Sequence, residues 1–194
     1  MSAFPAPTSL ANAIATRRLA LEPMGYQHLQ GIWDAIEKSL PELRPWMAWA
    51  TDTTLEQTRS FVGRAERMWS SQRAEEWNFT IVLQGVPVGG LGLASAMQDL
   101  RRAELGYWIR SDHAGRGLTT EAASAIVAFG FDVVGLHRIE LHAAPSNAAS
   151  IRVAEKLGFR FEGLARHAGF AESQWQDMNI YGLLETDPRP TFHL

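Results

Sequence analysis

Residues 104–121, ELGYWIRSDHAGRGLTTE, decide the fold, and the rest of the chain can be understood outward from them. Residues 105–109 predict a strand, Gly115-Arg116-Gly117 a loop, and Thr119-Thr120-Glu121 the first turn of a helix. A strand that runs through such a loop into a helix directs several backbone N–H groups at one point, where the helix dipole adds positive potential. The glycines let a ligand approach the main chain closely. The stretch therefore predicts an anion site, with an ordinary surface turn as the alternative.

Two better-known phosphate loops do not fit this stretch. A P-loop requires Lys-Ser or Lys-Thr after its last glycine, and a dinucleotide-binding fingerprint requires a third glycine. The segment Gly89-Gly90-Leu91-Gly92 also lacks the required spacing, and it is typical of a kinked or bulged strand.

The composition limits the class of protein. A chain of 194 residues with 46% hydrophobic content predicts one domain with a sizeable core. A formal charge of −3 provides no global field for nucleic acid or an anionic membrane. The absence of cysteine excludes disulfides, thiolate catalysis and cysteine zinc ligands. Apolar runs too short to span a membrane, and a first segment unlike a signal peptide, lead us to expect a cytoplasmic protein.

Hydrophobic periodicity predicts the element order β-α-α-β-β-β-α-β-α-β-β. The predicted strands are residues 18–22, 77–83, 88–96, 103–109, 138–143, 159–166 and 177–184, and the predicted helices are 29–40, 55–69, 118–133 and 148–157. The first helix is expected to end before Pro41, and Thr53-Thr54-Leu55-Glu56 has a capping-box pattern for the second. Residues 1–16 are predicted to be an arm, 17–186 a single domain and 187–194 a tail.

The order of these elements predicts the fold class. An antiparallel meander that meets a parallel β-α-β unit forms a mixed sheet flanked by helices, an α/β (α+β) arrangement.

Aromatic residues and histidines add candidate site residues. Trp46 and Trp49 lie in the proline-bounded segment PELRPWMAWA, where they are expected to line an apolar pocket or a partner surface. His113 beside the loop is expected to flank a ligand or to lie on the surface. The other histidines have no i, i+4 pair or carboxylate companion in the sequence, so no metal site is predicted; they are His28, His137, His142 and His167.

Two segments together resemble a known family. GRGLTTEA at the head of a helix, followed about 30 residues later by NAASIRVAEKLGFRFEG, resembles the GNAT superfamily of N-acetyltransferases. The motifs AELGYWI, N-x-x-S, KLGF-x-x-EG and WQDMNIYGLL are most similar to its ribosomal-protein serine/alanine N-terminal acetyltransferase branch. The resemblance extends from Arg17 to Leu184. It implies the acyl-CoA N-acyltransferase fold, a mostly antiparallel seven-stranded sheet splayed at its central parallel pair and flanked by four main helices.

The resemblance also implies a cosubstrate, acetyl-CoA, and the residues that hold it. The family's pyrophosphate loop corresponds to residues 114–119, although Ala114 and Thr119 depart from its usual ends. Main-chain N–H groups are still expected to bind the phosphates, and Arg116 could add charge, as could Arg110, Arg152 or Lys156 more weakly. The implied cofactor-binding set is Tyr107, Trp108, Ile109, Gly115, Arg116, Gly117, Leu118, Thr119, Thr120, Asn147 and Ser150.

Catalytic roles follow from the same resemblance. Glu104 is implied as the base that acts on the amine through water, with Glu140 as its rival or as a substrate-binding residue beside Trp46 and Trp49. Some relatives use a tyrosine as proton donor four residues after Ser150. That position is Ala154 here, which leaves Ser150 to protonate the leaving thiolate.

The cost of deprotonation bears on the acceptor. Neutralising an α-amino group at pH 7 costs about 1 kcal/mol, whereas a lysine costs about 4.6 kcal/mol. A single carboxylate that acts through water thus favours the N-terminus of a protein, such as a ribosomal protein. The alternatives are a small-molecule amine (antibiotic, polyamine or amino acid) and a non-catalytic CoA-binding module. No direct contact with nucleic acid or membrane is expected. The sequence leaves both a monomer and a homodimer as alternatives.

Overall fold

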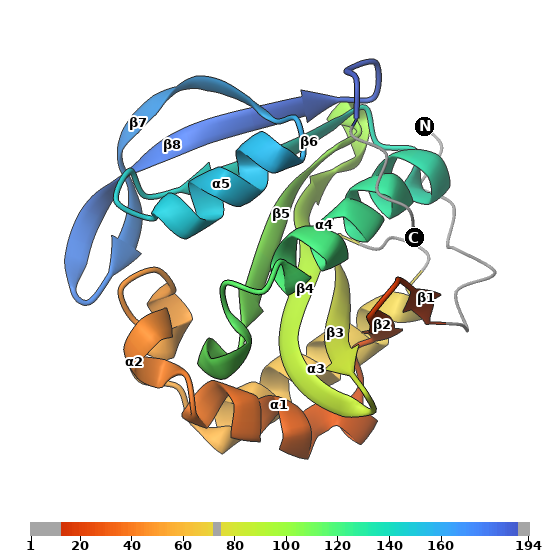
Figure 1. Cartoon of the computed structure of the whole chain (residues 1–194), viewed down its shortest axis with the longest axis vertical. Coiled ribbons are helices and arrows are strands. Elements are labelled where there is room, and N and C mark those ends of the chain that lie inside the picture. The colour runs from red at the N-terminus through yellow and green to blue at the C-terminus, as the bar shows by residue number, and fades with distance from the viewer. Residues whose placement is uncertain (1–12, 72–74, 190–194) are drawn as a thin grey trace.

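The computed structural model describes residues 13–71 and 75–189, and the strands in this part of the chain form a mixed sheet (Figure 1). The eight strands lie in the order β1-β2-β3-β4-β5-β6-β8-β7, and every neighbouring pair is antiparallel except β5 and β6. Ile14–Ala15, within the predicted arm, adds one strand to the predicted seven. The strands are β1 Ile14–Ala15, β2 Leu19–Pro23, β3 Trp77–Leu83, β4 Val86–Met97, β5 Arg102–Ile109, β6 Arg138–Ala143, β7 Arg160–Ala171 and β8 Gln174–Leu184.

Helices cover both faces of this sheet. Leu21, Phe79, Leu93 and Ile139 belong to the larger core, to which α4 contributes Ile126. A smaller core lies between the sheet and the pair α1 and α3, on the other face. No helix within the described ranges is long and apolar enough to cross a membrane. The helices are α1 Leu29–Glu37, α2 Leu40–Leu43, α3 Leu55–Trp69, α4 Leu118–Ala128 and α5 Ala148–Lys156.

Three details of the predicted helices are wrong. Pro41 occupies the first turn of α2, where its missing N–H costs little, so the predicted helix 29–40 is interrupted after α1. The capping box lies one residue later than predicted, between Thr54 and Gln57. Val133, predicted to face inward, has 46% of its surface exposed because α4 continues as a π-helical turn, Phe129–Val134.

The β7–β8 hairpin is longer than the sequence predicted. Residues 167–176, predicted as a connection, extend both strands to a tight turn at Glu172 and Ser173, whose φ values are 48° and 60°. Its register shifts twice, which hides the alternation in the sequence. Gln176 donates a hydrogen bond to the carbonyl of Pro45 (3.1 Å). The hairpin thus contacts the loop that carries Trp46 and Trp49.

The parallel pair β5–β6 is splayed, as predicted. Backbone pairing joins Arg102 to Arg138, Ala103 to Ile139 and Glu104 to Glu140, and the register then ends. Both strands continue beyond this point, β5 to Ile109 and β6 to Ala143, and Figure 1 shows them diverging. The backbone groups of β5 that face this gap beyond Glu104 therefore have no partner in a β6 ladder.

Candidate active site

The glycine loop ends at the first turn of α4, beside the splay. Gly115 and Gly117 have φ values of 73° and 76°, in the left-handed region that glycine tolerates. A Cβ atom at Gly115 would meet no atom within 4 Å, so its surface is open. The first hydrogen bond of the helix runs from Glu121 N–H to the Gly117 carbonyl. The amides of residues 118–120 precede it, as an anion site requires.

The connection between β1 and β2 contacts this loop and the first turn of α4, which the sequence did not reveal. Arg18 forms an ion pair with Glu121 (2.7 Å) and donates a hydrogen bond to the Arg116 carbonyl (3.0 Å). Thr16 also donates to Glu121 (2.7 Å). Burial disfavours the charged form of Glu121, but the hydrogen bonds from Thr16 and Arg18 outweigh it and lower its pKa. Thr16, in the predicted arm, and Arg18, at the start of the predicted domain, thus link the N-terminal segment to the glycine loop and α4.

A groove of about 630 Å³ follows the splay, and we call it the splay groove. It contains most of the predicted cofactor-binding residues. Leu118 is an exception, because its side chain is buried in the core with 3% exposed. The side chain of Arg116 is exposed and lies 3.1 Å from His113 Nδ1. The lining includes residues 104–109 and 141–144, Ala114, Gly115, Gly117, Thr119, Thr120, Asn147, Ser150, Arg152, Lys156 and Trp46.

Two hydroxyl groups meet on the α4–α5 side of the splay. Tyr107 Oη lies 2.8 Å from Ser150 Oγ. Burial raises the pKa of Tyr107 to about 12, against the smaller opposing effect of its hydrogen bond with Ser150, so the phenol remains protonated at neutral pH. Asn147 Oδ1 accepts the N–H of Ser150 (3.1 Å), which caps α5 and fixes Ser150. A tyrosine is therefore present beside Ser150, although it comes from β5 rather than from the position of Ala154.

Two carboxylates and a histidine meet on the opposite face. Glu104 and Glu140 are in register, and His142 lies two residues along β6 on the side of Glu140. His142 Nδ1 lies 3.6 Å from Glu104, and its Nε2 lies 3.3 Å from Glu140.

The prediction that these histidines lack carboxylate companions is wrong for three of them. Besides His142, His28 contacts Glu22 (2.8 Å) and His137 contacts Glu185 (2.9 Å). Within the described residues, no group of three or more His, Cys, Asp or Glu is placed to hold a metal ion.

The two candidate bases differ in their partners. Glu140 accepts hydrogen bonds from Arg102 (3.2 Å) and Arg138 (2.9 Å). Burial raises the pKa of Glu140, but these arginines outweigh burial and lower it overall. The side chain of Glu104 lines the splay groove and is 41% exposed. Glu140 is thus engaged in a network of charges, whereas Glu104 is open to a ligand.

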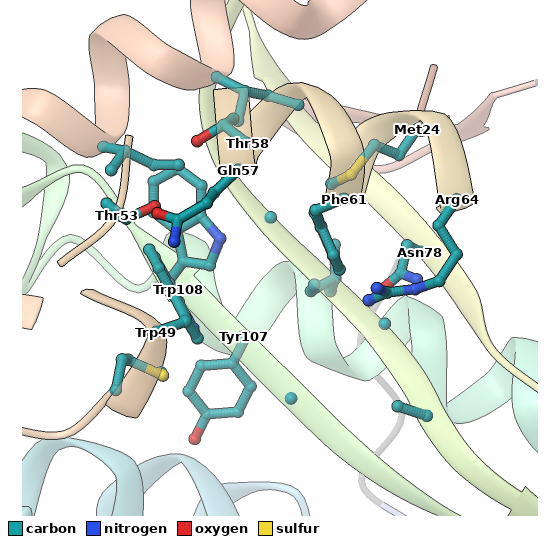
Figure 2. Close-up of a pocket in the computed structure, with 18 of the residues that line it drawn as sticks. Met24, Trp49, Thr53, Gln57, Thr58, Phe61, Arg64, Asn78, Tyr107 and Trp108 are labelled. Atoms are coloured by element: carbon teal, nitrogen blue, oxygen red, sulfur yellow. The ribbon is translucent and has the colours of Figure 1, made fainter. Parts of the chain in front are cut away.

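A second cavity, of about 590 Å³, lies on the α1/α3 face, and we call it the tryptophan pocket (Figure 2). The rings of Trp49 and Trp108 meet edge to face at its wall, with centroids 6.0 Å apart. Trp46 lines the splay groove instead, so the two predicted tryptophans serve different cavities. Both cavities share residues 106–108 and Met47. They are therefore neighbours across the same stretch of β5.

A sheet split at its parallel pair, with the open start of a helix beside it, is the arrangement expected of an enzyme that transfers an acyl group from coenzyme A. The family model described as an acetyltransferase (GNAT) domain matches residues 18–160, well over half of the chain. The chain belongs to this family of acetyltransferases.

Curated relatives include enzymes with different acceptors. The probable N-acetyltransferase YjcK of Bacillus subtilis is 34% identical over 119 residues, 60% of this chain and 66% of that protein. Spermidine N(1)-acetyltransferase of Escherichia coli is 31% identical over 53% of this chain and 55% of that enzyme. The ribosomal-protein-serine acetyltransferase of Escherichia coli is 25% identical over 84% of this chain and 90% of that enzyme.

Solved structures confirm the fold. RimL, a ribosomal L7/L12 α-N-protein acetyltransferase in complex with coenzyme A, aligns with a TM-score of 0.82 at 21% identity and covers 89% of this chain and 97% of its own. Mycobacterium smegmatis RimJ in complex with a CoA disulfide aligns with a TM-score of 0.79 at 25% identity, covering 89% of this chain and 87% of its own.

Enzymes of this family take their acetyl group from acetyl-CoA, which is therefore the cosubstrate of this chain. The residues present fit it. Gly115 and Gly117 leave the amides at the start of α4 accessible, and the splay groove leads from them along β5 to Ser150.

Proposed function

We propose that the chain transfers the acetyl group of acetyl-CoA directly to the α-amino group of a peptide or protein, with ribosomal proteins as candidate acceptors. One observation carries the proposal. At the end of the β5–β6 ladder, an open carboxylate lies on one face of the sheet and a pair of protonated hydroxyls lies on the other. Acetyl transfer to an amine needs a proton acceptor at nitrogen and a proton donor at sulfur.

Glu104 is the base in this proposal. Bound acetyl-CoA supplies the acetyl thioester in the splay groove. Glu104 removes a proton from the incoming ammonium group through a water molecule, and His142 holds the carboxylate in place from β6 (3.6 Å). An α-amino group requires only about 1 kcal/mol for this step at pH 7, which suits one partly exposed carboxylate. Glu140 stays ionised between its arginines and serves to position His142.

Ser150 and Tyr107 provide the proton on the other face. Ser150 Oγ donates a proton to the leaving sulfur, and Tyr107 Oη donates to Ser150 Oγ across the 2.8 Å contact. Asn147 uses its Oδ1 as a cap, which leaves its Nδ2 as a donor toward the pantetheine amides. Unpaired N–H groups of β5 near Tyr107 polarise the thioester carbonyl. The amides of residues 115–120 bind the diphosphate.

A small-molecule amine with an apolar body is the second candidate acceptor. The observation that favours it is the tryptophan pocket, because 590 Å³ lies within the range of small-ligand sites, about 300–1,000 Å³. Spermidine N(1)-acetyltransferase is among the relatives, which shows that the family includes enzymes for small amines.

An acetyl-CoA consumption assay tests the function. The panel comprises N-terminal peptides, ribosomal proteins and small amines, with Glu104→Gln and Ser150→Ala beside the wild type. Glu37→Gln serves as a matched control, because Glu37 is exposed on α1 and lines neither cavity. We expect the wild type to acetylate peptides. Turnover should fall strongly in both site variants and stay unchanged in the control. Wild-type activity in both site variants would refute the assigned roles.

A further inference from the structure

We propose that the tryptophan pocket binds an aromatic or branched apolar group of the acceptor, attached within a few atoms of the reacting amine. This inference rests on the proposed N-acetyltransferase function and specifies the chemistry of its acceptor. Two sources share this chemistry: a peptide whose first residue has a large apolar side chain, and a small amine with an apolar body. The experiment below distinguishes them.

The pocket lies on the same face of the sheet as Glu104. Side chains alternate along a strand, so Glu104, Gly106 and Trp108 share one face of β5. On the neighbouring strand β4, Ala94 pairs with Glu104 and Gly92 pairs with Gly106. A group that rests in the pocket therefore lies one to two residues along the sheet from the proposed base. An amine attached to such a group reaches Glu104 without crossing the sheet.

The floor of the pocket is formed by small residues, with the side chains of Trp108 and Met24 over Gly90 and that of Asn78 beside Gly92. Gly90, Gly92 and Ala94 of β4 and Gly106 of β5 all line it. A Cβ atom at Gly106 would meet no atom within 4 Å, which shows that the floor is open at this point. Small residues in adjacent strands let a flat group lie directly on the sheet.

The walls are apolar and aromatic. Figure 2 shows Trp108 and Trp49 on one side of the cavity and Phe61 and Met24 on another. The rings of Trp49 and Trp108 are inclined at 64°, and such walls favour an aromatic or branched guest, which can pack against one face and one edge at once. The apolar lining is formed chiefly by Met24, Ile32, Ile36, Trp49, Phe61 and Trp108.

Charge in the pocket opposes a polycation. Asp52 is the one acidic side chain among the described lining residues, and it is exposed. Arg64 lies over the ring of Phe61 (5.1 Å to the centroid) and is paired with Glu76 (3.0 Å). The described lining offers no further carboxylate for the second and third ammonium groups of a polyamine, so an apolar guest suits this pocket better.

Two buried polar groups in the lining point to a guest with a polar atom. Thr58 Oγ1 and Asn78 Nδ2 are buried and have no hydrogen-bond partner, and the whole Thr58 residue is 4% exposed. Both residues line the pocket, and Figure 2 shows them on different sides of it. An unpaired buried polar group is unfavourable, and a ligand that supplies a hydroxyl or carbonyl relieves it. A polar substituent on an apolar guest, such as the hydroxyl of a phenol, would pair with one of these two groups.

The test compares acceptors that differ only in the group beside the amine. Peptides with Phe, Leu, Gly or Asp as first residue form one arm, and phenethylamine, tyramine, ethylamine and spermidine form the other. We expect kcat/KM to be about 30- to 100-fold higher for Phe than for Gly, and for phenethylamine than for ethylamine. The set with the higher kcat/KM, peptides or small amines, identifies which of the two carries the apolar group that the pocket binds. Ratios near one in both arms, with acetylation still measurable, would overturn this inference and leave the proposed function standing.

Trp49→Ala links the preference to the pocket. Trp49 is 42% exposed and lies outside both hydrophobic cores, so its loss should leave folding intact, and thermal unfolding checks this. Trp175→Ala is the matched control, because it removes another exposed indole that lines neither cavity. We expect the Phe/Gly and phenethylamine/ethylamine ratios to fall at least about 10-fold in Trp49→Ala and to persist in Trp175→Ala. Equal ratios in the two variants would contradict the assignment.

If no acceptor is acetylated, a binding measurement tests the inference instead. Titration of phenethylamine, followed by tryptophan fluorescence, reports on Trp49 and Trp108 without turnover. Saturable binding that Trp49→Ala abolishes and Trp175→Ala retains supports the pocket, even if the proposed acetylation fails. Absence of saturable binding in the wild type overturns the inference.

Discussion

The two faces of the sheet at the splay differ in their chemistry. The α1/α3 face carries Glu104, Glu140 and His142, together with the apolar tryptophan pocket. The α4–α5 face carries the neutral hydroxyls of Tyr107 and Ser150 and the open amides at the start of α4. The carboxylates suit removal of a proton from an amine. The hydroxyls and amides suit an anionic cosubstrate and a leaving thiolate.

One strand contributes to both faces. Because side chains alternate along β5, Glu104 faces the acceptor side while Tyr107, three residues later, faces α5. The β6 ladder ends at Glu104, so the two sides communicate just beyond that residue. The sheet therefore separates the proton acceptor from the proton donor. The two sides are connected through the gap between β5 and β6.

The largest effect is expected on the acceptor face. Glu104→Gln should lower kcat/KM by about 100- to 1,000-fold, because the amide cannot accept the proton. Glu140→Gln should affect turnover far less and chiefly destabilise the fold, since Arg102 and Arg138 lose their shared partner. Steady-state kinetics and thermal unfolding of both variants measure the contrast. A larger loss of turnover in Glu140→Gln would reverse the assignment of the base.

The donor face should show a coupled pair. Ser150→Ala should lower kcat by about 100-fold and Tyr107→Phe by about 10-fold, and the double variant should be no worse than Ser150→Ala. Burial raises the pKa of Tyr107 from its ordinary value of about 10 to about 12. The phenol is therefore fully protonated below pH 10 and loses its proton only as the pH rises through about 12. The rate profile of the wild type should therefore show no alkaline loss near pH 10 from this group. Fully additive effects in the double variant would show that the two hydroxyls act separately.

A smaller effect is expected at His142, which positions Glu104. His142→Gln should lower kcat by about 10-fold with little change in KM, because Glu104 loses a neighbouring side chain. His137→Gln is the matched control, since His137 also contacts a glutamate but lines neither cavity. An unchanged kcat in His142→Gln, or an equal loss in His137→Gln, would leave His142 a purely structural residue.

The smallest effect is expected at the glycine loop. Gly115→Ala meets no steric obstacle, but its φ of 73° should cost about 1 kcal/mol of folding stability. Gly85→Ala, with a φ of 79° and open space in the β3–β4 turn, should cost the same. Calorimetry with coenzyme A should show weaker binding only in Gly115→Ala. Equal affinities in the two variants would place the phosphates elsewhere.

Local patterns predicted most of the fold. The order of strands and main helices follows from periodicity, because burial of one face repeats every two residues in a strand and every 3.6 in a helix. Bulges interrupt that repeat in the β7–β8 hairpin, so residues 167–176 looked like a connection. Ile14–Ala15 is too short to produce a period at all.

The site was predicted less completely, because its contacts join distant residues. Tyr107 and Ser150 are 43 positions apart, so the absence of a tyrosine at position 154 did not exclude one from β5. A search for i, i+4 spacing missed His142, whose companions are Glu104 on the neighbouring strand and Glu140 two residues before it. The Glu-x-His spacing on the strand next to Glu104 was the available signal.

The most direct test is a crystal structure of the chain with coenzyme A and phenethylamine. We predict the diphosphate at the amides of residues 115–120, the sulfur in the gap between β5 and β6 within hydrogen-bond reach of Ser150 Oγ, and the amine on the side of Glu104. Coenzyme A bound on the α1/α3 face, or an amine on the same side as Ser150, would contradict it.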